Sequence, residues 1–333
     1  MLCYSLDRNN IWSIDDDAFR GVGPELEMVD MSHNRLVRIK LVAVFRYLPR
    51  LRVLRMRYNS LVDIGSPTAT LPAVVELDLT GNEFRHVPSR ALASLPALRR
   101  LLLRDNRIQH VGASAFASAA FLEHVDLGAN RFTRRGEGGG GQLTIDRYSF
   151  CGLEPRALSR SPGVTDWTGL QQVRLDHNGL TQPQLCSLMA VWTLVDVDVA
   201  GNPLRCDCRL LTTLRRLSDI AIGLRIDDSA QCASPDRVAG QTLAETLTRH
   251  WQPTCDDDDD DGGVSECSEA PCDAVPLQSL ASSSSLTGGD FTHRVCAVAL
   301  TLAIVRILAW VQTTPRRRLI SVCRTTHPTT DGR

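Results

Sequence analysis

A hydrophobic pattern with a period near 24 residues runs through the first two hundred residues of the chain. In each period two apolar residues, such as Leu101 and Leu103, precede an asparagine, here Asn106. Residues two apart lie on the same face of a β-strand, so each pair predicts a short strand with one buried face. Eight asparagines mark the frame, at intervals of 23 to 25 residues and one interval of 48: Asn9, Asn34, Asn59, Asn82, Asn106, Asn130, Asn178 and Asn202.

A second apolar group follows most asparagines and predicts the far side of each coil. Its members include Ile14 and Phe19, Ile39 and Phe45, and Val111 and Phe116. One coil cannot bury its own apolar face, so neighbouring coils must stack into a curved solenoid. The asparagine amides then satisfy backbone groups that the turns would leave buried, and we interpret all eight as structural.

The frame Leu98, Leu101, Leu103, Asn106 resembles the leucine-rich repeat. The resemblance implies a right-handed α/β-type solenoid with a parallel concave sheet of about eight strands and a mostly irregular convex side. Residues 1–201 are expected to form these repeats. At the end of the repeats, a terminal unit must cover the last apolar face.

The interval of 48 residues equals two periods, yet it does not predict a missing repeat. Ile145 and Phe150 reproduce the spacing of Ile14 and Phe19, so they look like the back of the Asn130 repeat, delayed by an insertion. Two surface insertions therefore explain the length. They lie at about 133–142, which is rich in glycine, and at 154–166.

The outward strand positions form the concave surface, where such repeat proteins usually bind. Asp30, Arg55 and Asp78 stand at equivalent positions, and on strands about 4.8 Å apart they would alternate in sign. One interpretation is self-compensating surface charge. The other is a basic ligand-binding patch with an aromatic anchor. This candidate site comprises Arg55, Arg57, Tyr58, Arg100 and Arg104.

Four cysteines follow the last repeat, at Cys206, Cys208, Cys232 and Cys255. A bond between the first two would close a strained ring, so two pairings remain open. The segment 202–255 resembles the C-terminal cysteine-rich flank of extracellular leucine-rich-repeat proteins of the Slit, Toll, Trk and platelet glycoprotein Ib type. That resemblance implies Cys206 with Cys232 and Cys208 with Cys255. A zinc site is the alternative, but paired CxxC spacing is missing.

Beyond the cap the composition predicts a membrane anchor. Residues 256–294 are acidic and then rich in Ser and Gly, as in a stalk, and residues 295–311 are apolar apart from Arg306 and one threonine. Basic residues in the tail, 312–333, favour a single-pass type I topology with that tail in the cytoplasm. The Arg306 side chain can extend toward the lipid headgroups, or it can pair with an acidic residue in the membrane helix of a co-receptor. A lipid anchor and a tail anchor are the alternatives.

The remaining composition excludes several functions. A net charge of −1 gives no strong positive electrostatic potential for binding nucleic acid, and no catalytic, cofactor or metal-binding motif is recognised. No signal peptide precedes the first strand, so we expect a sequence truncated at its N-terminus. The predicted function is a plasma-membrane receptor or adhesion molecule for an extracellular protein ligand. A secreted or lipid-anchored regulatory protein and an intracellular scaffold are the alternatives.

Overall fold

The computed structural model describes residues 2–130, 143–153, 156–157, 167–221 and 223–249. The strands are β1 (Cys3–Ser5), β2 (Met28–Asp30), β3 (Val53–Arg55), β4 (Glu76–Asp78), β5 (Arg100–Leu102), β6 (His110–Val111), β7 (His124–Asp126), β8 (Thr144–Ile145), β9 (Arg156–Ala157), β10 (Trp167–Thr168), β11 (Gln172–Arg174), β12 (Asp196–Asp198), β13 (Leu204–Arg205), β14 (Arg225–Ile226) and β15 (Cys232–Ser234). The helices are α1 (Leu41–Phe45), α2 (Ser89–Leu92), the 3-10 helix η1 (Cys186–Ala190), α3 (Cys208–Ile220) and α4 (Leu243–Arg249).

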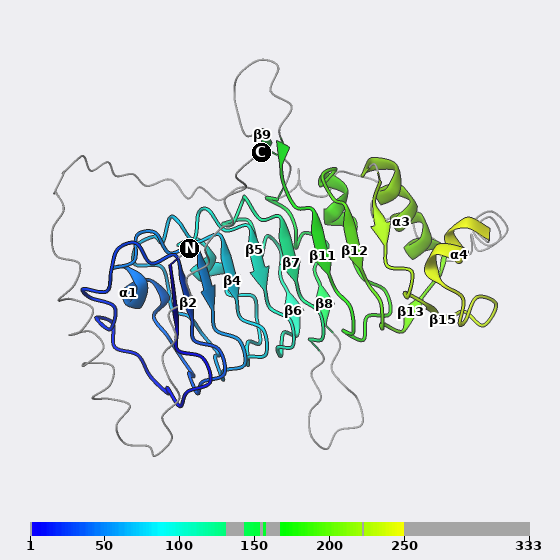
Figure 1. Cartoon of the computed structure of the whole chain (residues 1–333). Coiled ribbons are helices and arrows are strands. Elements are labelled where there is room, and N and C mark those ends of the chain that lie inside the picture. Colours follow the sequence, from blue (N-terminus) through cyan, green and yellow to red (C-terminus); the bar gives the residue numbers. More distant parts are fainter. Residues whose placement is uncertain (1, 131–142, 154–155, 158–166, 222, 250–333) are drawn as a thin grey trace, which may run out of the picture.

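A parallel sheet runs along the molecule, and it makes the fold a leucine-rich-repeat solenoid. Nine of the described strands form this sheet in the order β1-β2-β3-β4-β5-β7-β11-β12-β14, one beside the next (Figure 1). Eight of them are the strands that the asparagine frame predicts. The ninth, β14, comes from the C-terminal cap, where Asp196 pairs with Arg225. The cap therefore extends the sheet as well as covering its end.

Two apolar columns cross the strands and build the core. The central residue of each repeat strand is buried: Tyr4, Val29, Leu54, Leu77, Leu101, Val125, Val173 and Val197. The residue two positions later is buried as well: Leu6, Met31, Met56, Leu79, Leu103, Leu127, Leu175 and Val199. Behind them, the rings of Phe19 and Phe45 lie 5.2 Å apart, and those of Phe116 and Phe150 lie 5.5 Å apart. Burial of both columns supplies the main driving force for stacking the coils.

The asparagines of successive repeats tie neighbouring coils together. Asn106 donates from Nδ2 to the carbonyls of Leu79 and Leu103, both at 3.0 Å, and its Oδ1 accepts from the Phe84 amide at 3.1 Å. The same three-way connection recurs at Asn34, Asn59, Asn82 and Asn130. One side chain thus pairs backbone groups of its own coil and of the preceding coil, which would otherwise be buried without partners.

The long interval between repeats contains insertions and no extra repeat. Strand β7 pairs directly with β11, with His124 opposite Gln172. The back of the repeat resumes at β8, which pairs in parallel with β6, as Ile145 lies opposite Val111. Two short strands flank most of the second insertion, because β9 near its start pairs antiparallel with β10 just after its end. β9 stands beyond the ends of the strands of the main sheet (Figure 1). The expected insertion at 133–142 lies outside the described residues.

A disulfide-bonded cap covers the C-terminal end of the solenoid. Asp207 is the N-cap of helix α3, and its carboxylate accepts from the Leu210 amide. The buried leucines of the helix face inward onto the last coil: Leu210, Leu211, Leu214 and Leu217. A disulfide joins Cys206 to Cys232, with their Cα atoms 5.5 Å apart. Cys208 is disulfide-bonded too, and Cys255 lies outside the described residues, so their pairing stays a prediction. Cys151 and Cys186 are also disulfide-bonded.

The stalk, the expected membrane span at 295–311 and its Arg306 also lie outside the described residues. Of the helices that the structure does describe, none is sufficiently long and apolar to span a bilayer.

Candidate functional site

The five residues of the candidate site lie on or beside the middle strands of the concave sheet. Arg55 ends β3 and Arg100 begins β5, with β4 between them. Arg57 and Arg104 each follow the end of a strand by two residues, so they continue the same outward face. Tyr58 occupies the turn after Arg57, with a positive φ of 50°. The repeat thus brings residues nearly fifty positions apart onto one surface.

Arg55 and Arg100 converge on one carboxylate. Arg55 lies 3.4 Å from Glu76 Oε1, and Arg100 lies 3.5 Å from Glu76 Oε2. The Glu76 side chain is 13% exposed, whereas those of Arg55 and Arg100 are 35% and 53% exposed. The predicted alternation of charge across Asp30, Arg55 and Asp78 does exist in the register, but Arg55 is paired diagonally with Glu76.

Arg57 is held by a carboxylate beneath it. Its Nε donates to Asp78 Oδ2, and the Asp78 side chain is fully buried. The other oxygen of Asp78 accepts from the Thr80 amide at 3.1 Å. A buried carboxylate requires such partners because its desolvation is otherwise very unfavourable. Arg57 is therefore a structural partner of Asp78 as well as a surface cation.

Arg104 makes an ion pair with two hydrogen bonds on the concave face. Its Nη1 and Nη2 donate to Asp176 Oδ1 and Oδ2 at 2.8 and 2.6 Å, and Asp126 lies 3.6 Å away. The hydrogen bonds to Asp176 raise the pKa of Arg104 despite partial burial. Burial alone would raise the pKa of Asp176, but hydrogen bonds from Arg104 and His177 outweigh it and lower that pKa.

This ion pair depends on a glycine between its partners. Asp176, Arg104 and Gly128 each follow the end of a strand by two residues, β11, β5 and β7 respectively, and Gly128 lies between the other two. A Cβ on Gly128 would stand 2.5 Å from Asp176 Oδ1 and closer still to Arg104 Nη1. Sequence reasoning missed Gly128, Asp176 and their role. The available signal was a glycine two residues after a strand, at a position that continues the strand's outward face.

Tyr58 forms an aromatic surface beside the arginines. Its ring stacks on His33 of the preceding repeat, with centroids 4.9 Å apart and planes 19° apart. The other side of the ring lies over Gly81, where a Cβ would come within 3 Å of ring carbons. Tyr58 remains 47% exposed. Its position is fixed by neighbours from both adjoining repeats, so it offers a rigid apolar contact area.

The C-terminal part of the concave face is richer in carboxylates. Burial, together with nearby Asp176 and Asp227, raises the pKa of Asp198 on β12. On β7, burial lowers the pKa of His124, whose Nδ1 lies 2.7 Å from Gln172 Oε1. The carboxylates of this part and the arginines in the middle of the sheet have opposite charges, so the electrostatic potential of the concave face changes along its length.

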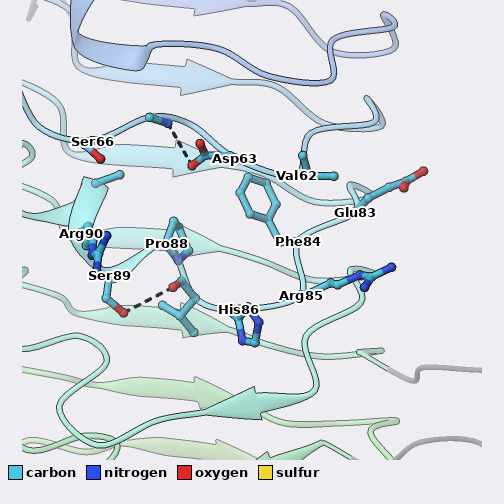
Figure 2. Close-up of a pocket in the computed structure, with 13 residues that line it drawn as sticks. Val62, Asp63, Ser66, Glu83, Phe84, Arg85, His86, Pro88, Ser89 and Arg90 are labelled. Carbon is cyan, nitrogen blue, oxygen red and sulfur yellow. Dashed lines mark hydrogen bonds between the residues drawn. The ribbon is translucent and has the colours of Figure 1, made fainter.

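A hollow of about 810 Å³ lies away from the strands, formed by the segments after Asn59 and Asn82 and by α2. Polar groups of the hollow form local hydrogen bonds with the backbone of the surrounding loops, as Figure 2 shows. Asp63 accepts from the Gly65 amide at 3.1 Å, and the Ser89 hydroxyl donates to the Val87 carbonyl. Nothing in this arrangement resembles a nucleophile with its base. Across the described part of the chain, no three His, Cys, Asp or Glu side chains are placed to hold a metal ion.

A comparison with protein-family models supports the repeat fold. The leucine rich repeat family model matches residues 5–61, 49–107 and 72–132. No curated protein matches the chain. Among solved structures, the chain is similar to that of the mouse RP105/MD-1 complex, at 20% identity and a TM-score of 0.49 over 72% of this chain and 40% of that chain. It is also similar to human 5T4 (Wnt-activated inhibitory factor 1, trophoblast glycoprotein), at 24% identity and a TM-score of 0.47 over 66% of this chain and 76% of that chain. The chain thus spans well under two thirds of the first of these structures.

Proposed function

Because the chain folds as a leucine-rich-repeat solenoid, we propose that it is a cell-surface receptor or adhesion molecule that binds a protein ligand through its concave face. The binding site is centred on Arg55, Arg57, Tyr58 and Arg100, and Arg104 supports it from the side. The observation that carries the proposal is a difference in exposure: the side chains of Arg55, Arg57 and Arg100 are 35%, 42% and 53% exposed, whereas their partners Glu76 and Asp78 are 13% and 0% exposed. A protein partner meets oriented guanidinium groups and a fixed aromatic ring, which are common features of interface hot spots.

The proposed location is the plasma membrane, with the repeats outside the cell. The disulfide between Cys206 and Cys232 supports an oxidising compartment, because cytosolic thiols are kept reduced. The proposed anchor is the apolar segment 295–311, through which Arg306 can contact a co-receptor helix. A secreted or lipid-anchored protein that sequesters ligands is the second candidate, since the same disulfide and the same concave surface suit it equally.

Two measurements test the location. The full chain is expressed in cells, and intact cells are labelled with a membrane-impermeant reagent, with and without phospholipase. Labelling that survives phospholipase is expected for a transmembrane protein, release indicates a lipid anchor, and recovery from the medium indicates secretion. Unlabelled protein with reduced thiols at Cys206 and Cys232 would instead identify an intracellular scaffold and contradict the proposal.

The binding function is tested by screening extracellular proteins against cells that display the full chain. The change Arg55→Ala with Arg100→Ala should weaken binding of the leading hit by roughly tenfold or more. A matched control removes two arginines from the hollow on the other side of the coils, Arg85→Ala with Arg90→Ala, and should leave binding intact. Equal binding by all three proteins would place the interface elsewhere.

A further inference from the structure

The arginines of the concave face differ in how tightly their N–H groups are bound by carboxylates of the protein. Arg104 makes two short hydrogen bonds to Asp176, and Arg57 is bonded to the fully buried Asp78. Both arginines neutralise carboxylates that the fold has removed from water. Removing either arginine would leave a buried charge without its partner, so the main role of these two arginines is to stabilise the fold.

Arg55 and Arg100 are held much more loosely. Their contacts with Glu76, at 3.4 and 3.5 Å, exceed the usual length of a good hydrogen bond, which is about 2.7–3.2 Å. Each guanidinium carries five N–H groups, and a single shared carboxylate cannot saturate ten of them. Counted by themselves, Arg55, Arg100 and Glu76 carry one excess positive charge, because two cations share one anion. Both guanidiniums therefore have donors available to a partner.

We propose that Arg55 and Arg100 receive a carboxylate of an acidic protein segment, which competes with Glu76 for their donors. This inference rests on the proposed function and names the chemistry of its partner. A carboxylate is planar and matches the guanidinium fork with two parallel hydrogen bonds. The neighbouring Leu102 on β5 is only 9% exposed, and this apolar side chain beside the site strengthens such bonds by reducing hydration.

The surroundings favour a segment with one acidic side chain over a polyanion. Asp30 flanks Arg55 on β2, and Asp126 flanks the cluster on β7. A nucleic acid or a sulfated glycan gains affinity by having many charges neutralised, and here it would meet carboxylates on both sides. A single carboxylate in an otherwise uncharged segment fits the one excess charge.

The test uses the purified full chain in detergent micelles and a random library of displayed 12-residue peptides. Peptides selected on the wild type should share one Asp or Glu, and replacing it with Asn or Gln should weaken binding roughly tenfold, as expected for a charge-assisted hydrogen bond. Arg55→Ala with Arg100→Ala should lose binding to a similar degree. Arg85→Ala with Arg90→Ala should bind as the wild type does.

Glu76→Gln provides the sharpest measurement. It removes the internal competitor, so affinity for the selected acidic peptide should rise, whereas a merely structural role for Glu76 predicts a loss. The change Arg55→Lys with Arg100→Lys keeps the charge and should recover only part of the binding, because the planar fork is lost. Matching far-UV circular dichroism shows that the variants fold.

Several outcomes overturn the inference. These are selected peptides without a shared acidic residue, weaker binding by Glu76→Gln, and heparin binding that depends on the two arginines while no acidic peptide is enriched. None of these readouts depends on cell-surface display. Acidic peptides selected by a protein that proves intracellular would support the carboxylate site and contradict the proposed function, so the two can fail separately.

Discussion

Replacing one asparagine of the ladder should have a cost that depends on the coils on either side of it. In Asn106→Ala the amide of Phe84 loses its acceptor, because Asn106 Oδ1 receives it at 3.1 Å. The carbonyls of Leu79 and Leu103 lose one donor each but keep another. They still accept from Asn82 Nδ2 at 2.8 Å and from Asn130 Nδ2 at 3.0 Å. The variant therefore leaves one buried N–H group without a partner.

The magnitude follows from these three groups. An unpaired buried N–H costs about 1–3 kcal/mol, and each weakened acceptor costs about 0.5–1.5 kcal/mol, so the free energy of unfolding should fall by roughly 2–6 kcal/mol. Asn9 provides a matched control, since its bonds within the described residues are both local, to the carbonyls of Leu6 and Asp7 at 2.9 and 3.0 Å. Asn9 is partly exposed, so water can replace those bonds and Asn9→Ala should cost no more than about 1–2 kcal/mol.

Urea unfolding of the full chain, followed by far-UV circular dichroism, measures the difference. We expect the midpoint to fall at least twice as far for Asn106→Ala as for Asn9→Ala, with a similar slope for both. Equal shifts would refute the reasoning, because they would mean that the bond from the preceding coil contributes nothing.

Three further predictions concern the concave face and the cap. Gly128→Ala should displace the ion pair above it and lower stability by about 1–3 kcal/mol in thermal unfolding, whereas Gly112→Ala, whose Cβ would find its nearest neighbour at 3.7 Å, should be close to neutral. Burial and nearby carboxylates raise the pKa of Asp198, so its ionisation destabilises the fold as pH rises through that pKa. Asp198→Asn should thus raise the melting temperature at about pH 7 and give no gain at about pH 3, and a gain at both would contradict this origin. Cys206→Ser should lower the free energy of unfolding by about 2–4 kcal/mol, and unchanged stability would mean that the disulfide contributes little.

The candidate site was only partly predictable. The repeat frame placed Arg55, Arg57 and Arg100 on one face, because residues at equivalent positions must align when coils stack. It could not show which acids lie below them. Arg55 is paired with Glu76 on the next strand and not with the aspartate beside it in register, since side-chain length and direction select the partner. Only the three-dimensional contacts therefore distinguish the arginines that stabilise buried carboxylates from those whose N–H groups can bind a partner.

The insertions set another limit. Asp176 is 72 residues from Arg104, and it comes within reach only because β7 pairs directly with β11 across the insertions. Sequence spacing predicted that pairing. It gave no reason to connect these two side chains over Gly128. Strand β14 was likewise unpredicted, because two residues without the asparagine frame carry no repeat signal and pair with β12 only through the cap.

The sequence by itself determined the solenoid. A period near 24 residues, with apolar pairs before each asparagine, leaves stacking as the only way to bury the apolar face, and each asparagine can pair backbone groups only in that arrangement. The tertiary structure decided the chemistry of the concave face. Charged side chains outside the core follow no period, and their exposure and pairing depend on the neighbours that the stacked strands bring within a few ångströms.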